Sequence, residues 1–97
     1  MSYTVAATYT VNPGEEDTVR EALEAMTPLT RAEPACKLYV AHRSSEDDSV
    51  FFLYEQYEDE DGFQAHFTSE HFERYIKGIV WPRLANRVRV IGTPLVP

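Results

Sequence analysis

The spacing of hydrophobic positions changes along the chain, and each change predicts a new element. From Tyr3 to Val11 the odd positions are apolar or aromatic and the even positions are mostly threonine, a two-residue period typical of a β-strand. From Glu15 to Arg31 apolar residues recur at helical spacing, and three acidic residues occupy the first turn, where the helix dipole favours negative charge. Pro28 is expected to end or kink this helix.

Two further apolar runs follow, separated by the polar turn Ser-Ser-Glu-Asp-Asp-Ser. Cys36 to Arg43 and Val50 to Tyr57 both have strand character, so they predict a β-hairpin with a loop of several residues. In the first of these strands, strict alternation would place Cys36 on one face and Tyr39 on the other.

Helical spacing returns after this hairpin. Asp59 suits an N-cap for a helix reaching about Phe67, and a second helical piece carries an apolar stripe up to Trp81. The last strand is expected from Arg87 to Ile91. The order β-α-β-β-α-β predicts an α+β fold of the ferredoxin-like, split βαβ type, with one antiparallel sheet and both helices on one face. Residues 1–97 are expected to form one domain.

The third strand, Val50 to Tyr57, is apolar on both faces. Phe52 and Tyr54 lie on one side, and Phe51, Leu53 and Tyr57 lie on the other. An antiparallel sheet with a solvated face should instead alternate between apolar and polar residues. The pattern therefore predicts a homodimer in which the helix-free faces of two sheets pack together.

Composition excludes several classes of partner. The formal net charge of −7 repels phosphate backbones and anionic lipid, so we expect neither nucleic acid nor membrane as a partner. No apolar run approaches the roughly 20 residues of a membrane span. Cys36 is the single cysteine, so no intrachain disulfide can form. The N-terminal segment alternates like a strand and lacks a basic leader, which favours a cytoplasmic location.

The chain also lacks the motifs of common cofactor sites. It contains no G-x-G-x-x-G and no phosphate-binding loop. His66 and His71 are five residues apart, which is not the i, i+4 spacing of a helical zinc pair. The sequence therefore predicts no metal and no organic cofactor.

Several short segments, taken in order, resemble the antibiotic biosynthesis monooxygenase (ABM) domain family. They read Arg31-Ala32-Glu33-Pro34-Ala35-Cys36, then Tyr39, then Phe52-Leu53-Tyr54-Glu55-Gln56-Tyr57, then Ala65-His66 and His71-Phe72. The flanking strand and helix pattern extends the resemblance over nearly the whole chain. Two departures are Ala35, where the family usually has glycine, and Tyr57, where it often has tryptophan.

The resemblance implies a dimeric α+β barrel that oxidises quinol-like or polyphenolic compounds with O2 and needs no flavin, haem or metal. His66 is then the preferred catalytic base, since histidine titrates near neutral pH, and Glu55 is its expected carboxylate partner. The residues expected to contact substrate are Tyr39, Tyr57, Phe63 and His71. No asparagine in the first strand matches the set used by haem-degrading relatives, so haem cleavage is disfavoured.

Other interpretations of the same residues stay open. Glu55, in mid-strand among apolar neighbours, must be paired or have a raised pKa, and a structural pair with Arg31 or Arg43 would also satisfy it. His71, near a helix start, could equally be an exposed histidine without a role. The whole chain could be a non-catalytic dimeric barrel that binds a small apolar ligand. It could also be an isomerase or lyase that uses His66 and Glu55 without oxygen.

Overall fold

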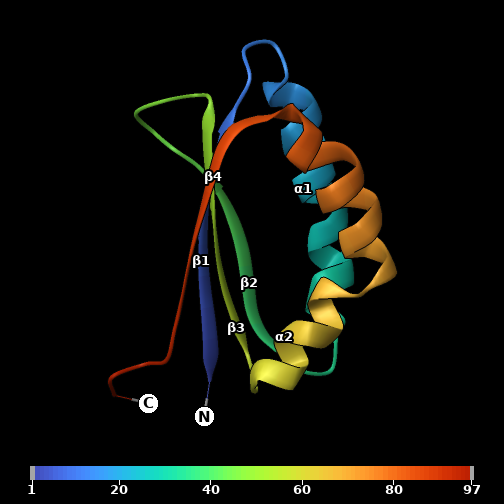
Figure 1. The fold of residues 1–97 in the computed structure, drawn as a ribbon, viewed down its shortest axis with the longest axis vertical. Helices are drawn as coiled ribbons and strands as arrows, with labels where there is room; N and C mark the ends of the chain where they lie inside the picture. Colours follow the sequence, from blue (N-terminus) through green and yellow to red (C-terminus); the bar gives the residue numbers. More distant parts are fainter. Residues whose placement is uncertain (1, 97) are drawn as a thin grey trace.

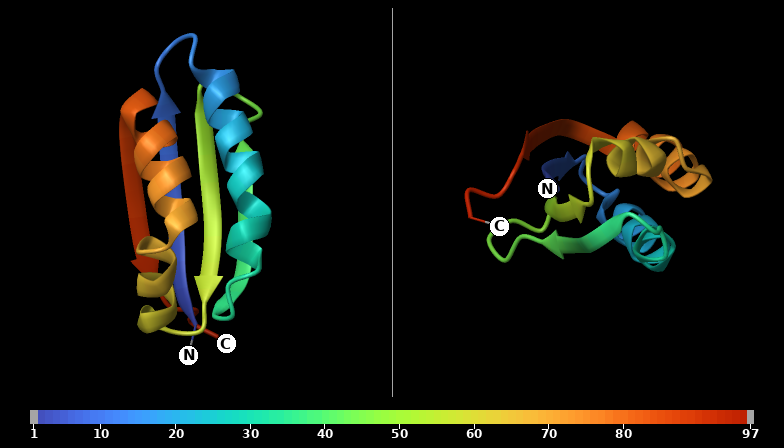
Figure 2. Two further views of the ribbon diagram at one scale, coloured as in Figure 1. Left: turned by 90° about the vertical axis from the view of Figure 1, so that its right-hand side faces the viewer. Right: turned by 90° about the horizontal axis from the view of Figure 1, so that it is seen from below.

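Four antiparallel strands form the single sheet of the computed structural model, which describes residues 2–96. The strands lie in the order β2-β3-β1-β4. Their bounds are Tyr3–Val11 for β1, Cys36–Arg43 for β2, Val50–Tyr57 for β3 and Leu84–Gly92 for β4. All helices lie on one face of this sheet (Figures 1 and 2). The fold is therefore the α+β, ferredoxin-like arrangement that the sequence pattern predicts.

The first helix, α1, spans Glu16–Arg31 and packs its apolar stripe on the sheet. Of the two predicted effects of Pro28, an end or a kink of this helix, the end is wrong, because the helix runs past Pro28. Proline removes only its own N–H donor, whereas its carbonyl still accepts the N–H of Ala32 at 3.1 Å. The helix therefore continues to Arg31, which brings the connector to β2 down to the end of the sheet.

The second helical region is divided into short pieces, α2 (Glu60–Phe67), η1 (Phe72–Val80) and η2 (Trp81–Arg83). The predicted cap at Asp59 is confirmed, because its side chain accepts the N–H of Gly62 at 2.8 Å. The nine residues of η1 form a π-type helix. None of the helices within residues 2–96 is long and apolar enough to cross a bilayer.

Alternate side chains of the central strands β1 and β3 point to opposite faces of the sheet. Phe51, Leu53 and Tyr57 are buried beneath the helices, while Phe52 and Tyr54 are each 40% exposed on the opposite face. No element of the described chain covers that opposite face (Figure 1). It also carries exposed apolar side chains from the edge strands, namely Leu38, Val88 and Val90.

The two edge strands differ from the simple pattern. In β2 the register with β3 shifts between Cys36 and Leu38, so Cys36 packs on the helix side with Tyr39 instead of on the opposite face. Strand β4 begins at Leu84, three residues before the predicted Arg87. Pairing with β1 extends the strand there, across a register irregularity at Thr10 and Val11.

Candidate functional site

Two connections meet at one end of the sheet, and they carry most of the ionisable side chains of interest. The α1–β2 connector holds Glu33, and the chain leaving β3 enters α2, which holds His66. Gly62 allows these two segments to touch, since a Cβ at this position would lie only 2.6 Å from the Cβ of Ala35. A backbone hydrogen bond of 2.9 Å from Glu58 N–H to the Ala35 carbonyl fixes the same contact.

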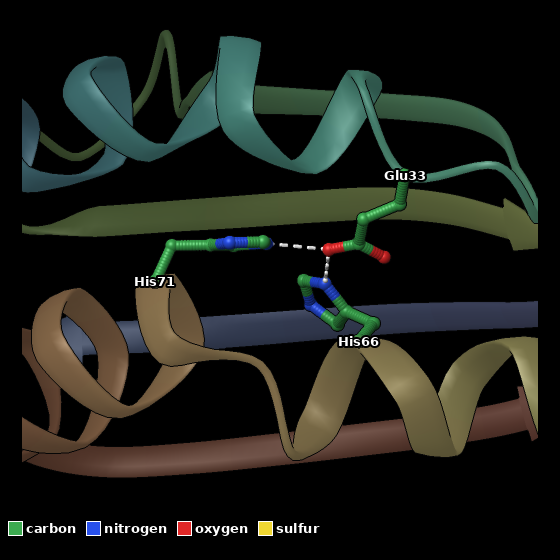
Figure 3. Close-up of side chains that lie close together, drawn as sticks. All are labelled: Glu33, His66 and His71. Carbon is green, nitrogen blue, oxygen red and sulfur yellow. Dashed lines mark hydrogen bonds and ion pairs between the residues drawn. The ribbon is translucent and has the colours of Figure 1, made fainter.

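Glu33 binds both histidines of the site. Its Oε2 atom lies 2.8 Å from Nδ1 of His66 and 2.5 Å from Nε2 of His71. Figure 3 shows the three side chains pointing toward one another from three different segments. Only 2% of the His66 side chain, 13% of Glu33 and 16% of His71 is exposed. Both imidazole groups therefore donate to one carboxylate oxygen in a largely dry cluster.

Glu55 lies on the other side of His66. It is 5% exposed, accepts the hydroxyl of Tyr57 at 2.6 Å, and has its Oε1 3.7 Å from Nε2 of His66. Burial raises the pKa of Glu55, while the Tyr57 hydroxyl and the nearby His66 partly offset that rise. The carboxylate is therefore a stronger base than an exposed glutamate.

The alternative pairing of Glu55 with an arginine is wrong. Arg31 instead donates its Nε–H to the carbonyl of Tyr39 at 3.0 Å. Arg43 donates to the carbonyl of Asp48 at 2.9 Å. Both guanidinium groups are engaged by backbone oxygens, so Glu55 relies on Tyr57 and His66.

Two tyrosines complete the surroundings of Glu55. Burial and the neighbouring Glu55 raise the pKa of Tyr57 far above its ordinary value, and the same two causes raise that of Tyr39. Both phenols therefore stay protonated at physiological pH. Tyr57 is consequently a permanent hydrogen-bond donor to Glu55.

A cavity of about 350 Å³ opens between the sheet and the second helical region. Glu55 is the single carboxylate among the described residues that line it. The other lining residues are mainly apolar, with two arginines: Val5, Ala7, Tyr9, Phe63, Phe67, Phe72, Trp81, Arg87, Val88 and Arg89. The cavity thus has one buried base, and its walls are mainly apolar and aromatic.

The two arginines come from β4 and add positive charge to the wall of the cavity. The guanidinium of Arg87 lies 3.5 Å from the centre of the Trp81 ring, and that of Arg89 lies 5.6 Å from the centre of the Phe63 ring. Cation–π contacts of this kind orient the guanidinium groups. Pattern reasoning missed both arginines, because the predicted strand gave no indication of which face met the helices.

The expected site residues fall into two groups, those that line the cavity and those that do not. Phe63 and Glu55 line the cavity, whereas His66, His71, Tyr39 and Tyr57 are not among the residues of 2–96 that do so. The alternative of an exposed, idle His71 is wrong, since Glu33 binds it. Glu33 itself was not predicted as a site residue. The element order held a signal for it, because α1 must end where β3 ends in this topology.

A search of the curated proteins found no match. The chain does match a family model described as "Antibiotic biosynthesis monooxygenase" over residues 2–78.

Solved structures with the same fold cover almost the full length. A protein from Pseudomonas aeruginosa, PA3566, is 30% identical with a TM-score of 0.90, over 97% of this chain and 94% of that one. Rv0793 from Mycobacterium tuberculosis is 25% identical with a TM-score of 0.90, over 98% and 96%. A putative antibiotic biosynthesis monooxygenase from Nitrosomonas europaea is 24% identical with a TM-score of 0.92, over 99% and 92%, and supports the fold alone. The family model, which matches residues 2–78, shows that the chain belongs to the antibiotic biosynthesis monooxygenase family.

Proposed function

We propose that this protein oxidises a small quinol-like or polyphenolic compound with O2 and uses no metal or organic cofactor in the reaction. The observation that carries the proposal is the cavity with a single buried carboxylate, Glu55, among aromatic walls. Its volume of about 350 Å³ lies at the small end of ligand pockets, which span about 300–1,000 Å³. An aromatic molecule of a few rings suits that space.

An electron-rich phenol needs little help to react with oxygen once it has lost its proton. Glu55 faces the cavity and is the group in position to take this proton. Arg87 and Arg89 lie on the same cavity and favour the phenolate that remains. The apolar walls exclude water and hold the ring in one orientation.

The overall reaction balances without another redox partner. A phenol ring with one C–H converted to C=O becomes a quinone and gives up four electrons. O2 accepts these four electrons, leaving one oxygen atom on the ring and releasing the other as water. The phenolic proton and the proton from the ring carbon both end in that water. No external reductant is required.

His66 enters this proposal as the partner of Glu55. The sequence-based hypothesis made His66 the proton acceptor, and that role stays a prediction. With its Nε2 3.7 Å from Glu55 and almost no exposed surface, His66 is better placed to act through Glu55 than on the substrate. Glu33 on the opposite ring nitrogen fixes the orientation of this imidazole.

The homodimer also remains part of the proposal. Its support is the helix-free sheet face, where Phe52, Tyr54 and Val90 are 40%, 40% and 65% exposed. Burying one such side chain contributes roughly 1.5–3 kcal/mol, so a second copy on this face gains substantial stability. A dimer of this kind closes the fold into the α+β barrel.

Oxygen uptake by purified protein tests the proposal. The protein is treated with a chelator and offered a panel of quinols and polyphenols in an oxygen electrode. We expect consumption of one O2 per substrate, and ¹⁸O2 should label one oxygen of the product. Ligand binding without turnover would support the non-catalytic barrel, and conversion under anaerobic conditions would support an isomerase or lyase.

A further inference from the structure

The spacing of His66 and His71 along the chain predicts no metal, but we propose that these two histidines and Glu33, brought together from three segments, form a binding site for a divalent transition-metal ion such as Zn²⁺. Each residue offers one ligand atom, and the three atoms all lie within 4.8 Å of one another. Two imidazole nitrogens and a carboxylate are a donor set that zinc and iron accept readily. The site lies behind Glu55 and off the cavity, because none of the three is among the described residues that line the cavity.

Only one of the two Glu33 carboxylate oxygens has hydrogen-bond partners in the cluster. Both histidines approach the same atom, Oε2. The other oxygen, Oε1, is buried and has no hydrogen-bond partner among residues 2–96. A buried acceptor without a partner destabilises the folded chain. An ion between the three groups would bind Oε2, and only a carboxylate that holds the ion through both oxygens would also give Oε1 a partner.

The three groups are in direct hydrogen-bond contact, which is tighter than an ion between them requires. Zinc lies about 2.0–2.2 Å from nitrogen and oxygen ligands, so tetrahedral ligands are about 3.4 Å apart. The present N···O distances of 2.8 and 2.5 Å are shorter than that. Binding therefore needs the Glu33 carboxylate to withdraw from the two imidazoles by less than about 1 Å.

The Glu55 carboxylate lies near the ring nitrogen of His66 that would not bind the ion. Metal-binding histidines usually donate the other ring N–H to a carboxylate or carbonyl. With Nδ1 of His66 on the ion, its Nε2 faces Glu55 at 3.7 Å. The ring is held further by Phe72, whose ring centre lies 5.1 Å away at nearly a right angle. His71, with 16% of its side chain exposed, leaves an entry path from solvent.

Bound in this way, the ion would tie the α1–β2 connector to α2 and to the start of η1. Ions that bind only the folded chain stabilise it in proportion to the logarithm of their concentration. The role that follows is to fix the position of His66 behind Glu55, without contact with the substrate.

Titration with ZnCl2 tests the site, using calorimetry on the full chain after removal of metals with a chelator. We expect one Zn²⁺ per chain and an unfolding midpoint that rises on its addition. His71→Ala should weaken binding by about tenfold or more, and Glu33→Gln, which keeps the side-chain volume, should do the same. MgCl2 should not bind, because Mg²⁺ prefers oxygen ligands.

Two control variants separate this site from adventitious binding. His42→Ala removes the histidine of β2 that lies outside the cluster, and Cys36→Ser removes the single thiol; both should bind Zn²⁺ like the unaltered protein. Absence of binding by the unaltered protein, or unchanged binding by His71→Ala and Glu33→Gln, would overturn the proposal. Oxygen uptake is measured on metal-free protein, so the failure of either proposal leaves the other one testable.

Discussion

At the scale of single residues, burial decides which side chains keep their protons. Tyr9 on β1 lines the cavity and is 7% exposed, and burial raises its pKa to about 12. The unfolded chain releases the same proton near pH 10. Between these values the folded state therefore binds more protons than the unfolded state, and stability falls as pH rises.

This difference predicts how a Tyr9→Phe variant responds to alkali. The unaltered protein should lose on the order of 2–3 kcal/mol through Tyr9 alone between pH 10 and 12. Tyr9→Phe should lack this part of the loss, so its urea midpoint should fall less steeply over that range. Equilibrium unfolding at pH 8 and at pH 11.5 measures the effect, with pH 8 as the internal reference. Parallel profiles for the two proteins would contradict the assignment.

The same scale shows what the sequence could reveal about the site. Glu55 and His66 were identifiable because each is an ionisable group placed among apolar residues at strand or helix spacing. Glu33 was not identified, since a glutamate in the connector before Pro34 looks like an ordinary solvated residue unless the element order is used to place it beside the end of β3. Its burial arises only when α2 packs against the connector, which is a tertiary event.

At the scale of elements, the contact between α2 and the α1–β2 connector depends on one missing side chain. Gly62→Ala would place a Cβ 2.6 Å from that of Ala35, so α2 must shift away. We expect a loss of roughly 1–3 kcal/mol in the free energy of unfolding. Gly78→Ala is the matched control, since its Cβ would lie 3.4 Å from its nearest neighbour, the Glu73 carbonyl oxygen. It should be neutral, or stabilising by up to about 1 kcal/mol.

A double-mutant cycle makes this prediction specific. Ala35→Gly removes the opposing methyl group and restores the residue usual in the family. Combined with Gly62→Ala it should recover most of the lost stability, so the two changes should not be additive. Additive effects in urea unfolding would show that the methyl–methyl contact is not the cause.

Hydrophobic spacing predicted the existence and order of the elements, while their ends and faces depended on tertiary contacts. The two-residue period identified β1, which is a half-buried strand, whereas β3 was recognised from its dense run of apolar and aromatic residues. It failed for Cys36, where a register shift reverses the expected face. It also shortened β4, whose first residues are held by pairing with β1 rather than by an apolar pattern of their own.

At the scale of the whole molecule, the helix-free face of the sheet predicts how the chain assembles. Phe52→Asp places a charge on that face and should convert a dimer to a folded monomer in sedimentation experiments. Leu53→Asp, one residue further along β3, places the charge in the core, where the side chain is 2% exposed, and should unfold the chain instead. A monomeric wild-type protein at micromolar concentration, or a Phe52→Asp variant of unchanged mass, would exclude this interface.

In the proposed reaction, a buried carboxylate on an apolar cavity supports oxygen chemistry without a cofactor. The most direct test is the oxygen-uptake rate of Glu55→Gln, which keeps the shape of the side chain and removes its basicity. With a quinol that the unaltered, chelator-treated protein oxidises, we expect a loss of about 10²–10⁴-fold, and a smaller loss for His66→Ala. Unchanged turnover in a folded Glu55→Gln variant would show that Glu55 is not the base of the reaction.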